Sequence, residues 1–426
     1  MRYVSTRGGQ GALNLDQALN AGLASDGGLF VPESLAPVTL RYSDSLPAVA
    51  AQVLAAFFVG SALAPELETI CAEALDLPLP ETPLRDENAA LLELFHGPTA
   101  AFKDFAARFL AACLARLNPQ QVPTTILVAT SGDTGGAVAA AFHRRPGFRV
   151  VILYPSGRVS ARQAHQLGAF GDNIHTYQVA GSFDDCQALV KSAFADQNLR
   201  SRVLITSANS ISLGRLLPQM AYYAYVSLRW QNARSASVNL LIPTGNLGNA
   251  LGAVLARRLG LPIGHIAMAA NANHVLSDFF ATGNYQPQQS LATLANAMDV
   301  GAPSNFERVR WLFPGRSARE ADLSAQSVAD AEIADMLRRA PDRYAVVVCP
   351  HTACALVRLE RLRAAGDKRA WLVAATAHPA KFESIVEPLI GRALAVPAGL
   401  ADLLQKPAYA ITLENNYPAL RSVLLS

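Results

Sequence analysis

The sequence has few cysteines and no long apolar run. Its five cysteines are odd in number and lack paired metal-binding spacing, which argues against a disulfide framework and against a structural zinc site. We expect them to be reduced thiols in the core. No stretch approaches the length needed to cross a bilayer, and the first residues contain no apolar signal segment. These absences predict a cytoplasmic protein without membrane contact.

Charge of either sign is also scarce. Charged residues make up 16% of the 426 residues, hydrophobic residues make up 51%, and the formal net charge is only +3. No long basic run is present, so nothing indicates binding to nucleic acid or to an acidic membrane surface. A chain of this length and composition can bury two or three large cores. Small metabolites are therefore the expected partners, and the oligomeric state is not predicted.

The first part of the chain is predicted to be helical. Three segments have apolar residues at helical spacing: residues 17–23, 47–58 and 66–75. Three prolines then follow within six residues, ending at Pro83, and proline ends helices and restricts the residue before it. We therefore predict a domain junction here, with an N-terminal region at residues 1–84 and a catalytic region at residues 85–426.

In the catalytic region, predicted strands alternate with predicted helices. The buried-strand candidates are residues 124–129, 150–155, 174–179, 238–242, 344–348 and 371–375. This alternation predicts an α/β protein with parallel sheets flanked by helices, in which ligands bind at the carboxyl ends of strands. A smaller subdomain is expected at about residues 105–215. The irregular stretch at residues 284–319 has two interpretations, an ordered active-site insertion or a mobile surface loop.

Lys103 is the first candidate for catalysis. Ala101, Phe102 and Phe105 enclose it, and it opens an apolar-periodic run that predicts a helix. Desolvation and a helix N-terminus both disfavour the ammonium form of a lysine, which makes its amine available to form an imine with an aldehyde. The alternative is a surface lysine whose stem lies on apolar neighbours.

A glycine-rich turn follows the strand predicted at residues 238–242. Its central residues are Gly245, Asn246, Leu247, Gly248 and Asn249. Their backbone N–H groups lie at the expected start of a helix, where they can bind a phosphate, although a helix-capping turn with no ligand is the alternative. The turn lacks the lysine of a Walker P-loop and the spacing of a dinucleotide motif. An aldehyde cofactor with a phosphate needs both this turn and a lysine such as Lys103.

Two further polar turns follow other predicted strands. The first consists of Ser131, Gly132, Asp133, Thr134 and Gly135. Its hydroxyl and N–H groups are suited to a substrate carboxylate, and an ordinary helix cap by Asp133 or Thr134 is the alternative. In the second turn, at residues 349–353, Thr352 is suited either to hydrogen-bond a heteroaromatic ring nitrogen or to cap the next helix. His351 alone is more often structural than catalytic.

Together these segments resemble the threonine synthase family, in the shorter group without the plant-type N-terminal extension. The similarity covers nearly the whole length and includes residues 3–8, 26–32, 93–105, 131–135, 207–211, 296–300 and 376–382. The two glycine turns alone occur across many pyridoxal-phosphate enzymes of the tryptophan synthase β type, whereas the joint set is far more specific. The resemblance therefore implies the α/β fold of those enzymes, known as fold type II.

The resemblance also implies an activity and a cofactor. It implies that a pyridoxal-phosphate-dependent lyase converts O-phospho-L-homoserine and water to L-threonine and phosphate, with the cofactor bound to Lys103 as an imine. By the same comparison, residues 245–249 bind the cofactor phosphate and Thr352 meets the pyridine nitrogen. The family usually has phenylalanine and aspartate where Leu247 and Asn249 stand. We expect Asn249 to cap the helix as a neutral side chain.

The substrate's own phosphate requires positive charge outside the cofactor loop. Arg215, with Ser210 as a neutral donor, is the candidate, because a guanidinium can hold a phosphate through two parallel hydrogen bonds. A structural ion pair is the alternative for Arg215, and Lys381 is then the next residue to consider.

Three other functions are compatible with parts of this sequence. A serine or threonine dehydratase-like lyase of the same fold shares Lys103 and the glycine turn but has no use for a second phosphate site. A non-catalytic pyridoxal-phosphate-binding homologue would bind the cofactor without turnover. A nucleotide-binding module would leave the apolar surroundings of Lys103 without a purpose.

Overall fold

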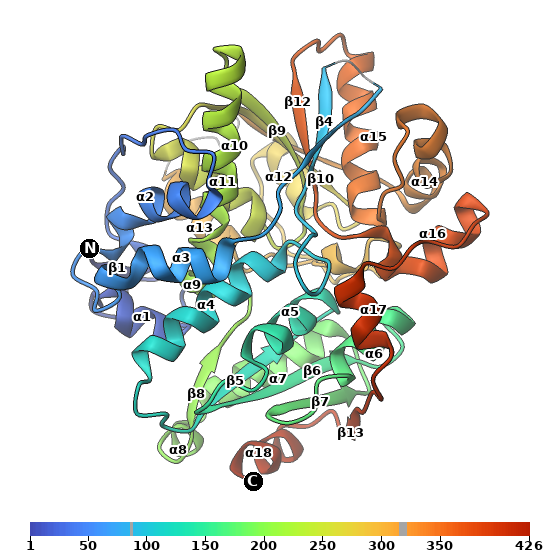
Figure 1. Cartoon of the computed structure of the whole chain (residues 1–426). Coiled ribbons are helices and arrows are strands. Elements are labelled where there is room, and N and C mark those ends of the chain that lie inside the picture. Colours follow the sequence, from blue (N-terminus) through green and yellow to red (C-terminus); the bar gives the residue numbers. More distant parts are fainter. Residues whose placement is uncertain (86–87, 315–321) are drawn as a thin grey trace.

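The computed structural model describes residues 1–85, 88–314 and 322–426. Two parallel sheets flanked by helices form most of the molecule, and the N-terminal helices lie together on one side of it (Figure 1). The six-stranded sheet occupies the upper part of Figure 1 and the five-stranded sheet the lower part. The predicted α/β architecture with parallel sheets is confirmed.

The N-terminal region contains a small antiparallel sheet of β1 and β2 and a group of helices. Its elements are β1 (Tyr3–Ser5), α1 (Leu15–Ala21), β2 (Phe30–Pro32), α2 (Leu46–Phe58), η1 (Ala64–Glu66) and α3 (Leu67–Leu75). Local signals set the helix starts: Asn14 and Gln17 form a capping box at α1, and the Ser45 hydroxyl caps α2. The three predicted helices are confirmed within two residues at each end.

The six-stranded sheet has the order β11-β10-β9-β12-β4-β3, and only its β3–β4 pair is antiparallel. Its strands are β3 (Glu81–Pro83), β4 (Ala89–Glu93), β9 (Val238–Pro243), β10 (Ile263–Ala270), β11 (Leu323–Ser327) and β12 (Trp371–Ala375). The helices that belong to this half are α10 (Gln219–Arg234), α11 (Gly248–Arg258), α12 (Val275–Thr282), η2 (Asn296–Met298), α13 (Phe306–Leu312), α14 (Asp330–Tyr344), α15 (Pro350–Ala364), η4 (Pro379–Phe382) and α16 (Glu383–Ile390).

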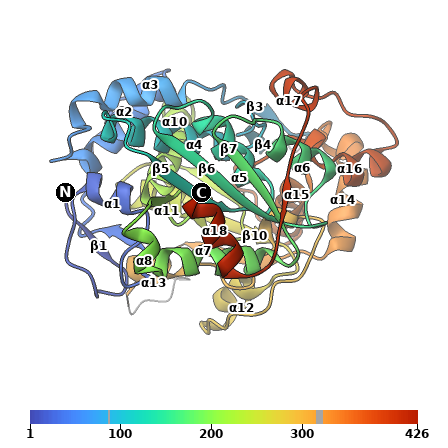
Figure 2. The ribbon, with the colours of Figure 1, turned by 90° about the horizontal axis from the view of Figure 1, so that it is seen from below.

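The five-stranded sheet has the order β13-β7-β6-β5-β8, and all of its pairs are parallel. Its strands are β5 (Thr124–Ala129), β6 (Phe148–Pro155), β7 (Ile174–Val179), β8 (Leu204–Ser207) and β13 (Ile411–Leu413). The associated helices are α4 (Lys103–Leu117), α5 (Asp133–Phe142), α6 (Ala161–Gly168), α7 (Phe183–Ala195), α8 (Gln197–Arg200), α9 (Leu213–Leu216), α17 (Ala398–Leu404) and α18 (Tyr417–Leu425). Seen from below, β5, β6 and β7 lie side by side, and the C-terminal helix α18 packs near α7 (Figure 2).

Most predicted strands are confirmed, but the strand predicted at residues 344–348 is wrong. Tyr344 is the last residue of α14, Ala345 adopts a left-handed φ of 60°, and Val346 to Val348 pair with no strand. The β-branched run gave a strand signal, yet it forms the short link between the end of α14 at Tyr344 and the start of α15 at Pro350. Tertiary context therefore overrides local propensity here.

The apolar core is continuous from the N-terminal helices to the helices of both sheets. Phe57 of α2, Phe105 of α4 and Tyr222 of α10 belong to one buried cluster. All five cysteines are buried and free, which confirms the expected core thiols. In the described parts of the chain, no helix is both long enough and apolar enough to cross a membrane.

Candidate active site

Lys103 is the first residue of α4, as predicted, and its side chain is only 13% exposed. Its ammonium nitrogen lies 5.3 Å from the centroid of the Phe102 ring. Burial lowers the pKa of Lys103 to about 8; the Asp133 carboxylate raises it and the Lys381 ammonium lowers it further. The pKa of Lys103 therefore lies closer to neutral pH than that of an exposed lysine, which favours the uncharged amine that forms an imine.

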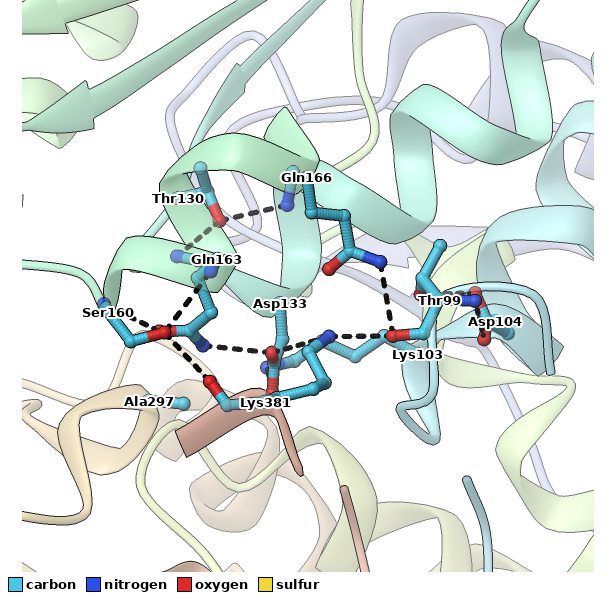
Figure 3. Close-up of polar contacts among 12 residues, drawn as sticks. Thr99, Lys103, Asp104, Thr130, Asp133, Ser160, Gln163, Gln166, Ala297 and Lys381 are labelled. Atoms are coloured by element: carbon cyan, nitrogen blue, oxygen red, sulfur yellow. Dashed lines mark hydrogen bonds and ion pairs between the residues drawn. The ribbon is translucent and has the colours of Figure 1, made fainter. Parts of the chain in front are cut away.

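Asp133 lies between two lysines (Figure 3). Its Oδ1 is 2.8 Å from Lys381 Nζ and accepts from Gln163 Nε2 at 3.0 Å, while Oδ2 is 3.9 Å from Lys103 Nζ. Burial alone would raise the pKa of Asp133, but the charges of Lys381 and Lys103 outweigh burial and hold it well below its usual range. Lys381 also donates to the Thr99 carbonyl at 2.7 Å. Lys381 is therefore part of a buried ion pair, and its role as the second candidate for the substrate phosphate stays a prediction.

The turn between β5 and α5 is shaped by its glycine and by Thr130. Gly132 has a φ of 127°, and a Cβ on it would lie 2.6 Å from Gln163 Nε2. The Thr130 hydroxyl oxygen accepts from the N–H groups of Gly132 at 3.0 Å and Gly135 at 2.8 Å. Gly132 is the N-cap of α5, and no described side chain caps this helix, so the alternative role of Asp133 or Thr134 as a helix cap is wrong. Three side chains of the turn line the cavity that contains Lys103: Ser131, Asp133 and Thr134.

The predicted phosphate loop, residues 245–249, lines the same cavity. Its left-handed residue is Leu247, with a φ of 63° at the N-cap of α11. Position 245 requires glycine because the backbone of Met298 lies close to it: a Cβ there would be 2.7 Å from Met298 Cα. A Cβ on Gly248 would meet no protein atom closer than 3.7 Å. The first N–H groups of a helix have no intrahelical partner, so the start of α11 is suited to an anion.

Asn249 does not cap α11, so that expectation is wrong. It is the second residue of the helix, inside the N-cap position held by Leu247. Its Oδ1 accepts a hydrogen bond from the Tyr223 hydroxyl, and its Nδ2 is buried without a partner in the described parts of the chain. Asn249 lines the cavity.

Asn249→Asp is expected to change cofactor affinity only modestly. Aspartate keeps an oxygen acceptor for the Tyr223 hydroxyl, so the dissociation constant should stay within about tenfold, or roughly 1.4 kcal/mol. Titration of pyridoxal phosphate into the apoprotein, followed by absorbance, measures it. Asn249→Leu is the control: it leaves the buried Tyr223 hydroxyl unsatisfied and should cost about 1–3 kcal/mol of stability. An aspartate variant that cannot retain the cofactor would contradict this account of the loop.

Arg215, on the short helix α9, is 2% exposed and also lines the cavity. One of its terminal nitrogens donates to the Ala208 carbonyl, while its Nε has no partner among the described residues. Among the residues that the structure describes, no carboxylate forms an ion pair with it, so a structural ion pair does not explain its burial. Burial lowers the pKa of Arg215 to about 10, which leaves it charged at neutral pH.

Ser210 lies beside the phosphate loop. Its hydroxyl oxygen accepts from Asn246 Nδ2 at 2.8 Å, and its carbonyl accepts from Asn305 Nδ2 at 3.2 Å. Asn305 also donates to the carbonyl of Asn246 at 3.0 Å. These contacts hold the segment before α9 against the loop before α11, so Ser210 and the loop line one cavity.

Thr352 faces a different cavity from Lys103. Its hydroxyl lies 3.3 Å from Cys349 Sγ, and it lines a neighbouring cavity beside β4. Thr376, directly after β12, lines the Lys103 cavity instead, and its carbonyl accepts from the N–H of Phe102 at 2.9 Å. A polar residue immediately after a predicted central strand was the signal that could have found Thr376.

The irregular stretch at residues 284–319 contributes to the site. Four of its residues line the cavity: Ala297, Met298, Val300 and Ser304. Asp299 anchors this segment by accepting from the Thr293 hydroxyl at 2.6 Å and from Asn271 Nδ2 at 2.7 Å. The interpretation as an ordered active-site insertion is confirmed for its described part, and residues 315–319 lie outside the described residues.

Comparisons with known proteins cover the chain from end to end. A family model for pyridoxal-phosphate dependent enzymes matches residues 79–376, and models for the N terminus and the C-terminal part of threonine synthase match residues 2–75 and 352–424. Threonine synthase of Serratia marcescens is 40% identical over 415 residues, with 96% of this chain and 95% of the relative covered. The corresponding enzyme of Escherichia coli is 37% identical, with 96% of each chain covered. The chain belongs to the threonine synthase family.

Solved structures of the threonine synthase family match the whole fold. The crystal structure of threonine synthase from Escherichia coli superimposes with a TM-score of 0.91 at 35% identity, covering 100% of this chain and 99% of the other. Threonine synthase from Brucella melitensis, solved with bound pyridoxal phosphate, gives 0.89 at 34% identity, with the same coverage. Maize serine racemase, at 18% identity and a TM-score of 0.55, shares the fold alone.

The residues of this threonine synthase family member fit pyridoxal phosphate. Lys103 offers a largely buried amine to the aldehyde, and the start of α11 offers N–H groups to the phosphate. Buried polar atoms that have no partner among the described residues also line the cavity, among them Arg215 Nε and His351 Nδ1. Such atoms are costly unless a ligand satisfies them. Pyridoxal phosphate is therefore the cofactor of this enzyme.

Proposed function

We propose that the protein converts O-phospho-L-homoserine and water to L-threonine and phosphate. The observation that supports this most directly is a second anion-binding group in the Lys103 cavity. Arg215 lies on α9, apart from the loop at residues 245–249. Among the residues that the structure describes, no carboxylate pairs with its buried guanidinium. A site for a phosphorylated cofactor and a phosphorylated substrate needs two phosphate-binding groups. A dehydratase site, whose substrate has no phosphate, needs only the group that binds the cofactor.

Several polar groups around the cavity have a proposed role. When bound, pyridoxal phosphate supplies an electron sink that stabilises negative charge at the substrate's Cα and Cβ. The amine of Lys103 moves protons to and from these carbons. Arg215 and the Ser210 hydroxyl bind the substrate phosphate. The Ser131 and Thr134 side chains, with the N–H groups around Gly132, bind the substrate carboxylate.

Two of the predicted roles change in this proposal. Asp133, as a buried anion, would repel a substrate carboxylate, so its proposed role is to hold Lys103 and Lys381 in place. Thr376, in place of Thr352, is proposed to meet the pyridine nitrogen, because it lines the Lys103 cavity. A hydroxyl there leaves the ring nitrogen largely unprotonated.

The domain division at residue 84, the subdomain at about residues 105–215 and the cytoplasmic location stay predictions.

The test of the proposed activity is the product balance. The purified protein, loaded with pyridoxal phosphate, should release phosphate and L-threonine in equal amounts from O-phospho-L-homoserine. A dehydratase-like lyase would instead form 2-oxo acids from serine or threonine, and a non-catalytic homologue would bind the cofactor without any product. Either of those results, without threonine formation, would contradict the proposal.

Arg215→Leu is expected to weaken substrate binding while the cofactor stays bound. A hydrogen bond to a charged group is worth about 1.5–3 kcal/mol, so the apparent affinity for O-phospho-L-homoserine should fall by roughly 10- to 150-fold. Initial rates over a range of substrate concentrations measure the change, and the absorbance of the bound cofactor checks that the site is intact.

Arg215→Lys is the matched variant for this prediction. Lysine keeps the positive charge but cannot form two parallel hydrogen bonds to the phosphate. The substrate affinity of the lysine variant should therefore lie between those of the unaltered protein and the leucine variant. Inhibition by inorganic phosphate should weaken in the same order. Unchanged substrate dependence in the leucine variant would mean that the substrate phosphate binds elsewhere.

A further inference from the structure

His351 is a buried polar residue for which the proposed mechanism gives no role. It is the second residue of α15, it is 3% exposed, and it lines the cavity that contains Lys103. Its ring packs against the Phe382 ring in a T-shaped arrangement, with centroids 4.9 Å apart. The imidazole is therefore held in one orientation by a helix and by an aromatic neighbour.

The hydrogen bond at Nε2 determines the tautomer of this imidazole. Nε2 lies 3.1 Å from the backbone nitrogen of Ala297 and accepts its N–H. A ring nitrogen that accepts has no proton, so in the neutral ring the proton is on Nδ1. Burial lowers the pKa of His351 to about 4, with Asp133 opposing and Lys103 reinforcing the shift. The ring is therefore neutral at physiological pH, with an N–H donor at Nδ1.

That Nδ1 donor has no partner among the described residues. Leaving a buried donor unsatisfied costs about 1–3 kcal/mol, so such groups are rare in structural positions. Arg215 Nε and Asn249 Nδ2 are in the same condition and line the same cavity. Other unpartnered donors, among them Ser212 Oγ and Arg358 Nε, lie outside this cavity. The position of His351 in the cavity wall is therefore what points to a bound ligand as its acceptor.

We propose that His351 Nδ1–H donates a hydrogen bond to an anionic oxygen of a molecule bound in the Lys103 cavity. Lys103, to which the cofactor attaches, and Asp133 line the same cavity as His351. The acceptor is therefore the ring oxygen of the cofactor or the carboxylate of the substrate. His351 binds through a fixed, neutral donor and transfers no proton. This inference rests on the proposed function.

Two substitutions separate this role from a structural one. In His351→Asn the side-chain amide replaces Nδ1–H, while the acceptor for the Ala297 N–H is lost. In His351→Gln the longer side chain supplies an acceptor near Nε2, while the Nδ1 donor is lost. If His351 binds the ligand, the asparagine variant should retain more ligand affinity than the glutamine variant. If His351 only supports the segment at Ala297, the glutamine variant should retain more.

Two titrations of the purified variants identify the acceptor. Pyridoxal phosphate is added to the apoprotein, and O-phospho-L-homoserine is added to the loaded protein, with absorbance followed in both. We expect the glutamine variant to bind either the cofactor or the substrate about tenfold or more weakly. Both affinities of the asparagine variant should stay within about threefold of those of the unaltered protein. Weakened cofactor binding indicates the ring oxygen, and weakened substrate binding alone indicates the carboxylate.

The inference is overturned if glutamine retains both affinities, or if the two variants lose them equally. Nitrogen NMR of the unaltered protein with labelled histidine gives a second measurement, which does not depend on how the variants fold. One histidine should remain neutral with its proton on Nδ1, and that proton signal should shift when the ligand binds. No shift with either ligand would also overturn the inference. An unaltered protein that binds cofactor but makes no threonine would refute the proposed function instead.

Discussion

Lys103→Ala is expected to yield a folded protein that forms no threonine. The substitution removes both the amine that attaches the cofactor and the group that moves protons, so no catalytic route remains. The fold should survive, because the side chain lies at the cavity and Asp133 keeps its closer partner, Lys381, at 2.8 Å. Threonine formation, the absorbance of the covalently attached cofactor and the melting temperature measure these three effects.

Lys368→Ala is the matched control for this prediction. Lys368 is exposed and takes no part in the cavity, so its variant should keep full activity and the full absorbance of the attached cofactor. The alanine variant at position 103 should still bind pyridoxal phosphate through the loop at residues 245–249, without covalent attachment. Substantial threonine formation by that variant would refute the assignment of Lys103.

Lys381→Met is expected to cause the largest loss of stability among the site variants. Lys381 is 1% exposed and pairs with Asp133, which is 2% exposed. The substitution leaves the buried Asp133 carboxylate with only the more distant Lys103, at 3.9 Å. Removing one partner of a buried ion pair typically costs about 3–5 kcal/mol. Denaturant unfolding of the variant measures the loss. Lys368→Met, the same change at an exposed lysine, should alter stability by no more than about 0.5 kcal/mol.

The pH dependence of this effect has a defined sign. The pKa of Asp133 in the folded protein lies well below its unfolded value of about 3.9. Its pairing therefore stabilises the fold above about pH 4, and this stabilisation is lost as the pH falls through the folded pKa. The stability difference between the unaltered protein and Lys381→Met should shrink on acidification. The double variant Asp133→Asn/Lys381→Met should be more stable than Lys381→Met alone, and equal stability would contradict the buried-charge explanation.

Features with local sequence signals were predicted well. The strand at residues 124–129, the start of a helix at Lys103 and the loop at residues 245–249 all follow from the residue types within a few positions. The apolar enclosure of Lys103 was visible in the sequence because its neighbours along the chain are aromatic and small. Periodicity and turn chemistry act over short distances, and these elements depend on little else.

Features that depend on distant segments could not be predicted. Whether Thr352 or Thr376 faces Lys103 depends on the position of β12 between β4 and β9, which no local pattern encodes. The pairing of Lys381 with Asp133 joins two turns far apart in the chain. The burial of Arg215 without a described carboxylate partner is likewise a property of the assembled cavity. His351 could be recognised as a donor only when its contact with Ala297 fixed the tautomer.

The ion pair between Asp133 and Lys381 also restricts how the molecule can move. Asp133 begins α5 beside the five-stranded sheet, and Lys381 follows β12 of the six-stranded sheet. The Ser160 hydroxyl and the Arg162 guanidinium, both near the start of α6, donate to the carbonyls of Lys381 and Ala380 at 2.7 Å. Separation of the sheets at this point would break a desolvated ion pair and both of these hydrogen bonds, so the contact resists movement of the two halves away from each other.

This contact has a direct consequence for the catalytic lysine. Lys103 Nζ lies 3.9 Å from the Asp133 carboxylate, which is held from the other sheet by Lys381. The position of the carboxylate beside Lys103 therefore depends on the two sheets staying joined at this point.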